Sequence, residues 1–144
     1  MTQFLTTPIY VLWLCIVLHL LADYNLQGCL ANLKCADWWV NVINTKAKSE
    51  ACKTANDEKL LFRMRYDWIS GLLCHATMWS AITFAPMAYT LSPEAWSAIV
   101  IANIMLHLYV DHLKANCWVI NLNTDQAIHL AQICGSFILW YYIR

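Results

Sequence analysis

Long apolar runs alternate with polar connections along this chain of 144 residues. The apolar runs cover about residues 4–27, 67–91, 93–114 and 124–143. Each run has close to the roughly 20 residues that a helix needs to cross a bilayer. The pattern therefore predicts an all-α, polytopic membrane protein in which four transmembrane helices form a single domain.

The connections between the runs differ in length and charge. Residues 28–66 form the one long polar segment, and they hold seven of the nine basic residues. The Ser92-Pro93-Glu94 sequence is typical of a helix start, so the second and third helices are predicted to be antiparallel neighbours. Basic residues mark the cytoplasmic side of a membrane. We therefore expect segment 28–66 in the cytoplasm and both termini outside.

Composition supports a lipid bilayer as the surroundings of this chain. The sequence is 60% hydrophobic and 12% charged, with a mean hydropathy of +0.47, whereas soluble domains have roughly 25% charged residues. The formal net charge is zero, which gives no support for nucleic acid as a partner. The seven cysteines are odd in number and include no Cys-x-x-Cys motif, so a disulfide framework is not expected.

Each predicted helix carries a histidine and an aspartate near one end. The pairs are His19–Asp23, Asp67–His75, His107–Asp111 and Asp125–His129. Three of these pairs have the i, i+4 spacing that places two side chains on the same side of a helix. In an up-down-up-down bundle all four pairs fall at the cytoplasmic end, at similar depth.

Histidine and aspartate together are typical of a metal site. An ionisable side chain inside a membrane costs roughly 2.5–3.5 kcal/mol, so such residues need partners. Imidazole and carboxylate bind Zn, Mn and Fe, and helix bundles build metal centres from inward-facing residues. The residues predicted to bind one divalent ion or two are His19, Asp23, His75, His107, Asp111, Asp125 and His129.

The predicted chemistry is metal-dependent hydrolysis of a phosphate-containing or lipid-linked substrate. A bound ion lowers the pKa of a water molecule, and Asp67 or Asp111 is expected to take the proton as the catalytic base. Lys114 is expected to stabilise the negative charge on a phosphate or acyl group. Lys34 either holds the same substrate or extends to the membrane surface.

Two other functions fit the sequence. The chain is alternatively an ion transporter or metal sensor, although the outer halves of the predicted helices contain few polar residues. It is alternatively a regulatory protein of a phage or bacterium that binds a host protein through the basic segment 34–65. In that case the His/Asp pairs are structural and fix the register of the helices. The sequence indicates no oligomeric state.

Several motifs resemble those of a family of small bacterial and phage four-helix membrane proteins whose function is not established. The motifs are His-Leu-Leu-Ala-Asp-Tyr-Asn-Leu-Gln (His19 to Gln27), Asn32-Leu33-Lys34, His75, His107-x-x-x-Asp111-x-x-Lys114 and Asp125-Gln126-x-x-His129. The resemblance covers the four apolar segments. It implies a multi-pass protein of the bacterial inner (cytoplasmic) membrane and supports the site more than the chemistry.

Overall fold

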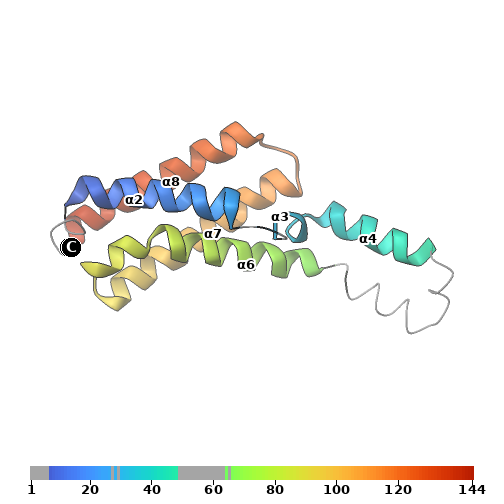
Figure 1. The fold of residues 1–144 in the computed structure, drawn as a ribbon, viewed down its shortest axis with the longest axis horizontal. Helices are drawn as coiled ribbons and strands as arrows, with labels where there is room; N and C mark the ends of the chain where they lie inside the picture. Colours follow the sequence, from blue (N-terminus) through green and yellow to red (C-terminus); the bar gives the residue numbers. More distant parts are fainter. Residues whose placement is uncertain (1–6, 27, 29, 49–63, 65) are drawn as a thin grey trace.

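A computed structural model of the chain describes residues 7–26, 28, 30–48, 64 and 66–144. Within these residues every secondary-structure element is helical, which confirms the all-α prediction. Four long helical segments run side by side (Figure 1). They are α2 (Pro8–Leu20) continued by η1 (Leu21–Asn25), α6 (Asp67–Thr83) followed by η2 (Ala85–Tyr89), α7 (Pro93–Ala115) and α8 (Leu122–Ile143).

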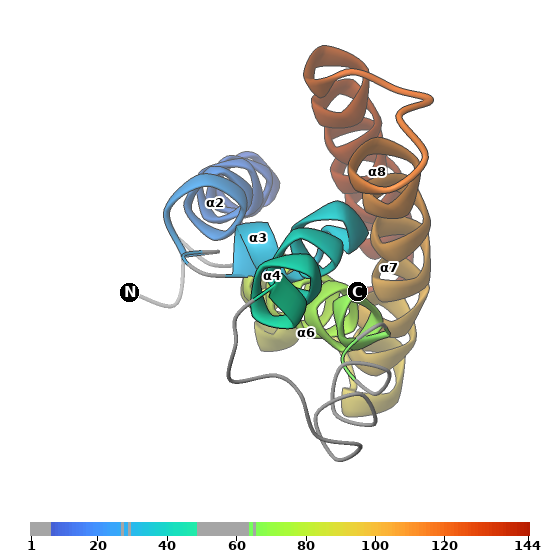
Figure 2. The ribbon, with the colours of Figure 1, turned by 90° about the vertical axis from the view of Figure 1, so that its right-hand side faces the viewer.

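The four long segments form a closed ring. Helix α2 packs against α6 and α8, α6 packs against α7, and α7 packs against α8. Viewed along the helices, α2, α6, α7 and α8 surround a shared interior (Figure 2). Val11, Trp79, Ile99 and Ile133, one from each helix, are buried in this interior. The sequence therefore specifies a bundle with one common core.

Two of the long segments change their helical form near an end. In η1 the N–H of Leu26 donates to the carbonyl of Leu21, five residues earlier, which makes a π turn. Such turns occur often at functional sites. Helix α6 ends at Thr83 and is followed by the 3₁₀ turn η2, which contains Pro86. Proline lacks the N–H that an α-helix needs, so the helix cannot continue regularly there.

The turn before α7 has the predicted structure. The hydroxyl of Ser92 accepts a hydrogen bond of 3.2 Å from the backbone N–H of Ala95, and Pro93 is the first residue of the helix. A hydroxyl in this position pairs one of the N–H groups that a helix start leaves open. Because the connection is short, α6 and α7 are antiparallel neighbours, as predicted.

The polar segment after η1 returns to the bundle. It contains the short helix α3 (Leu30–Leu33) and α4 (Ala36–Lys48), which lie at one end of the four long segments (Figure 2). Helix α3 packs against α6. Residues 49–63 and 65 of the basic segment lie outside the described residues. A host partner bound through segment 34–65 therefore stays a prediction.

Among the described residues, two helical segments are long and apolar enough to cross a membrane. They are Pro8–Asn25 and Pro93–Ala115. The sequence predicted four such segments. Helix α6 has only 17 residues, and α8 begins with the polar stretch Asn123-Thr124-Asp125-Gln126. Helix α6 is thus shorter, and α8 is more polar near its start, than the two segments that are long and apolar enough to cross a membrane.

The close contact between α3 and α6 predicts that one added methyl group at Gly71 destabilises the protein. A Cβ atom at Gly71 would lie 2.6 Å from the backbone carbonyl oxygen of Leu33, so Gly71→Ala must displace α3. We expect a loss of about 1–3 kcal/mol of stability, measured as a lower melting temperature in detergent. The matched control is Gly135→Ala, because a Cβ there meets nothing within 4 Å. Equal melting temperatures for both variants would contradict this packing.

Candidate metal centre

Helices α6, α7 and α8 each bring one histidine to the same depth of the bundle. His75 lies eight residues after the start of α6, and His107 lies eight residues before the end of α7. At 1.5 Å per residue, each is about 12 Å of helix from that end. His129 lies seven residues after the start of α8, or about 10 Å. All three side chains are buried.

The carboxylate of Asp111 lies between these three imidazoles. Its Oδ2 is 3.3 Å from Nε2 of His75 and 3.7 Å from Nε2 of His107. Its Oδ1 is 3.6 Å from Nε2 of His129. Asp111 is therefore at the centre of the cluster.

Two further carboxylates face the imidazoles from the sides. Oδ1 of Asp23, in the π turn, is 3.5 Å from Nε2 of His75. Oδ1 of Asp125 is 3.3 Å from Nε2 of His129. Six residues thus meet in one buried cluster, which we call the His/Asp cluster. It contains Asp23, His75, His107, Asp111, Asp125 and His129, all of them predicted as ligands from the sequence.

Each carboxylate of the His/Asp cluster also accepts a hydrogen bond from a donor at its edge. Lys34 lies 2.6 Å from Oδ2 of Asp111, and Lys114 lies 2.5 Å from Oδ2 of Asp125. Gln126 donates to Oδ2 of Asp23 at 2.6 Å. Such contacts orient ligating carboxylates in metal sites. The three carboxylates outnumber the two ammonium groups by one, so a bound cation or a protonated imidazole is needed to balance the charge of the cluster.

His19 was predicted as a ligand, but both of its ring nitrogens are hydrogen-bonded to other side chains of the protein. The indole N–H of Trp79 donates to Nδ1 of His19 at 2.8 Å. Nε2 must then carry the proton, and it donates to Oε1 of Gln126 at 3.1 Å. The amide of Gln126 in turn donates to Asp23 and Asp125. His19 therefore orients Gln126 instead of facing the cluster.

Several atoms of the His/Asp cluster have no hydrogen-bond partner among the described residues. These atoms are Nε2 of His75 and His129, both ring nitrogens of His107, and Oδ1 of Asp111 and Asp125. Buried polar atoms in proteins normally have partners. Gln132 accepts from Nδ1 of His129 at 2.8 Å, which directs the other ring nitrogen at the two carboxylates. A cation bound between the facing nitrogen and oxygen atoms would give each of them a partner.

Atoms from this cluster fall into two groups with the spacing of metal ligands. One group contains Asp23, His75 and His107, and the other contains His107, Asp111 and His129. Within each group the candidate ligand atoms lie within 4.8 Å of one another. The cluster is therefore geometrically able to hold an ion.

One residue expected at the site, Asp67, lies away from the cluster. Asp67 was predicted as a catalytic base, but it is exposed at the start of α6, about 12 Å of helix away from His75. An eight-residue spacing covers more than two turns, so the two side chains do not share one site. His112 stacks on Trp68, with ring centroids 5.3 Å apart, and it also lies outside the cluster.

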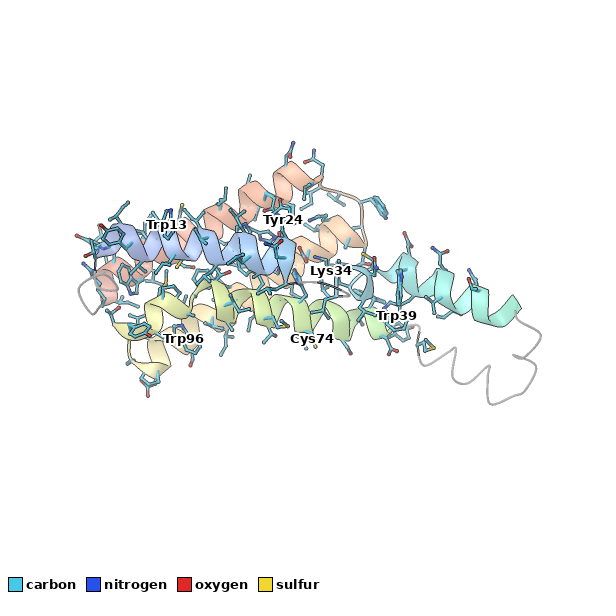
Figure 3. All side chains as sticks on the ribbon, viewed as in Figure 1. Trp13, Tyr24, Lys34, Trp39, Cys74 and Trp96 are labelled. Carbon is cyan, nitrogen blue, oxygen red and sulfur yellow. The ribbon has the colours of Figure 1, made fainter. Side chains whose placement is uncertain are left out.

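Lys34 lies inside the protein and does not extend from its surface. It follows α3 directly (Figure 3), and only 5% of the residue is exposed. The neighbouring Cys35 is partly buried, which raises the pKa of its thiol, and its Sγ donates to the carbonyl of Ala31. Lys34, which contacts Asp111, is therefore the residue that this segment contributes to the cluster.

Sequence analysis missed Trp79 and Gln132. Trp79 lies four residues after His75, and Gln132 lies three residues after His129. Both spacings place the pairs on one helix face. A search for polar neighbours of each candidate ligand at these spacings would have found them.

No protein-family model matches this chain, and neither the curated proteins nor the solved structures contain a significant match. Membership in the family that the motifs resemble therefore stays a prediction. The chemistry of the site has to be argued from its own geometry.

The Lys34–Asp111 pair predicts unequal effects of two lysine substitutions. Removing one partner of a buried ion pair costs about 3–5 kcal/mol because the other charge is left uncompensated. We expect Lys34→Met to lower the unfolding free energy by that amount in protein kept metal-free with a chelator. Lys114→Met is the matched variant, and it should lose less because its side chain is 26% exposed. Similar losses in chemical denaturation would contradict the burial of Lys34.

Proposed function

We propose that this chain is an integral membrane metal-binding protein whose His/Asp cluster holds a divalent ion. The supporting observation is the separation of the facing atoms. The five histidine-to-carboxylate contacts measure 3.3 to 3.7 Å. Charge-assisted hydrogen bonds are shorter, at about 2.7–2.9 Å. Two ligand atoms that each lie about 2.1 Å from a tetrahedral ion are about 3.4 Å apart.

The proposed ion is Zn, Mn or Fe. Imidazole nitrogen and carboxylate oxygen are the ligands that these ions accept. The hydrogen bonds from Lys34, Lys114 and Gln126 hold the carboxylates in place. The same contacts leave an oxygen of Asp111 and of Asp125 directed at the imidazoles.

We propose that all four long helices cross the membrane. Each of them carries large apolar side chains on its outer surface. Trp13, which points outward from α2 in Figure 3, is 56% exposed, Leu73 is 47%, Met105 is 64% and Ile138 is 57%. Soluble monomers rarely expose apolar patches of this extent. Lipid around the whole ring accounts for these surfaces, including those of α6 and α8.

The proposed orientation places the His/Asp cluster near the cytoplasmic face of a bacterial inner membrane. Helices α3 and α4, the described part of the basic segment, lie at the end of the bundle where α6 and α8 begin (Figure 1). Lys114 is in the last turn of α7 at the same end, and the cluster is nearer to it than to the other end of α7 and α8. Basic residues favour the cytoplasmic side. The exposed Trp118, in the connection between α7 and α8, suits the membrane–water interface at that end. Both termini are then outside.

We propose hydrolysis as the reaction. When bound, a divalent ion makes hydroxide available from water near neutral pH. Asp125 turns only its Oδ1 toward an imidazole, so its Oδ2, at the edge of the cluster beside Lys114, can accept the proton. Lys114 is partly exposed beside Asp125. It is therefore placed to attract and stabilise a phosphate that enters from the cytoplasmic side.

A groove between α7 and α8 supports a lipid-linked phosphate as the substrate. The groove has a volume of about 570 Å³ and is lined mainly by apolar and small residues, including Ala98, Ala102 and Leu106. Gln132 also lines it, and Gln132 contacts His129. An apolar chain in the groove would therefore lie beside the His/Asp cluster.

Metal analysis of purified protein tests the metal site directly. Wild-type protein, purified in detergent without added metal, should contain at least one ion per chain by elemental analysis. His107→Ala and Asp111→Ala should contain less metal per chain than the wild type because each removes a central ligand. His112→Ala is the control and should keep the wild-type metal content, because His112 stacks on Trp68 outside the cluster. Wild-type metal content in both cluster variants would contradict the site.

Activity is measured on the same preparations. Phosphate release from phosphatidic acid in mixed micelles should be abolished by a chelator and restored by the metal. It should exceed the release from soluble p-nitrophenyl phosphate, which has no chain to occupy the groove. Metal-loaded protein that hydrolyses neither compound would contradict the proposed reaction for phosphate monoesters.

Reporter fusions test the membrane topology. Alkaline phosphatase is active only outside the cytoplasm. Fused after Arg144 it should be active, and fused after Asn116 it should be inactive, because the four-helix topology places these positions on opposite sides. Activity at both positions, or at neither, would contradict the proposed topology.

A further inference from the structure

The His/Asp cluster offers more ligand atoms than one ion needs. A catalytic zinc ion takes three protein ligands and leaves one position for water. This cluster contains three imidazole nitrogens and the oxygens of three carboxylates. Five distances between a nitrogen and an oxygen measure 3.3 to 3.7 Å. We infer that the centre holds two metal ions bridged by the carboxylate of Asp111, an inference that rests on the metal-binding function proposed above.

The two oxygens of Asp111 face different imidazoles. Oδ2 lies toward His75 and His107, at 3.3 and 3.7 Å. Oδ1 lies toward His129 at 3.6 Å. A carboxylate that served a single ion would direct both of its oxygens, or only one, at the same set of partners. Asp111 instead presents one oxygen to each side of the cluster.

Each side of Asp111 has a terminal carboxylate of its own. Asp23 faces His75 at 3.5 Å on one side, and Asp125 faces His129 at 3.3 Å on the other. The first ion is then held by Asp23, His75, His107 and Oδ2 of Asp111. The second ion is held by Asp125, His129 and Oδ1 of Asp111.

Gln126 supports this division from outside the cluster. Its amide donates to Oδ2 of Asp23 at 2.6 Å and to Oδ2 of Asp125 at 3.2 Å. The two terminal carboxylates are thereby held by one side chain, and each turns its Oδ1 toward its own histidine. Trp79 and His19 hold Gln126 in the required orientation.

Two ions on either side of one carboxylate fit a phosphate substrate. In two-metal sites the ions are about 3.5–4 Å apart and stabilise the attacking and the leaving oxygen of an in-line displacement. Lys114 and Lys34 balance part of the carboxylate charge from the edges. A two-metal centre thus favours phosphoryl transfer to water as the reaction of the proposed hydrolase.

Titration of metal-free protein with Mn²⁺ alone tests the inference. Wild-type protein should bind two ions per chain at saturation and show the electron paramagnetic resonance signal of an exchange-coupled pair. His75→Ala removes a ligand of the first ion only, and Asp125→Asn removes a ligand of the second ion only. Each variant should bind one ion and show the signal of isolated Mn²⁺, whereas the His112→Ala control should behave as wild type.

The outcomes separate this inference from the proposed function. One ion per wild-type chain, with an isolated signal, would overturn the bridged pair and leave a metal-binding protein with one ion. No bound ion would overturn the proposed function itself. The ion count and the spectrum of the wild-type protein distinguish one ion from two even where a variant fails to fold.

Discussion

The structure depends on the electrostatics of one buried cluster, where imidazole nitrogens and carboxylate oxygens face each other. Nε2 of His75 and Nε2 of His129 lie 3.3 and 3.6 Å from the carboxylate of Asp111, and neither nitrogen has a hydrogen-bond partner among the described residues; nor does Oδ1 of Asp111. An unpaired polar atom in such surroundings is strongly destabilising. The proposed cation between the atoms would remove this penalty, and the contacts around the cluster would hold its ligands in place.

The surrounding contacts limit how the cluster can move. The return of α3 to the bundle brings Lys34 to Asp111, and it is possible because Gly71 leaves room for the backbone of Leu33. On the opposite side, Trp79 fixes the tautomer of His19, and His19 orients Gln126. Packing far from the carboxylates therefore determines their positions. A chain that lost these outer contacts would keep its ligands but not their geometry.

Much of this arrangement could be predicted from local sequence patterns. The i, i+4 pairs His107–Asp111 and Asp125–His129 lie on regular helices, and their residues meet as expected. The role of His19 could not be predicted, because it depends on Trp79 of another helix and on the π turn that follows it. The burial of Lys34 depends on the return of α3, which is a tertiary event. Asp67 lies apart from the cluster because its spacing from His75 exceeds two turns.

The most direct measurement is anomalous X-ray diffraction from crystals of the full chain, recorded above the absorption edge of the metal found in the purified protein. The account predicts anomalous density between Nε2 of His75, His107 and His129, next to the carboxylate of Asp111. Density only at other positions, or these side chains hydrogen-bonded to one another with no anomalous scatterer between them, would contradict it.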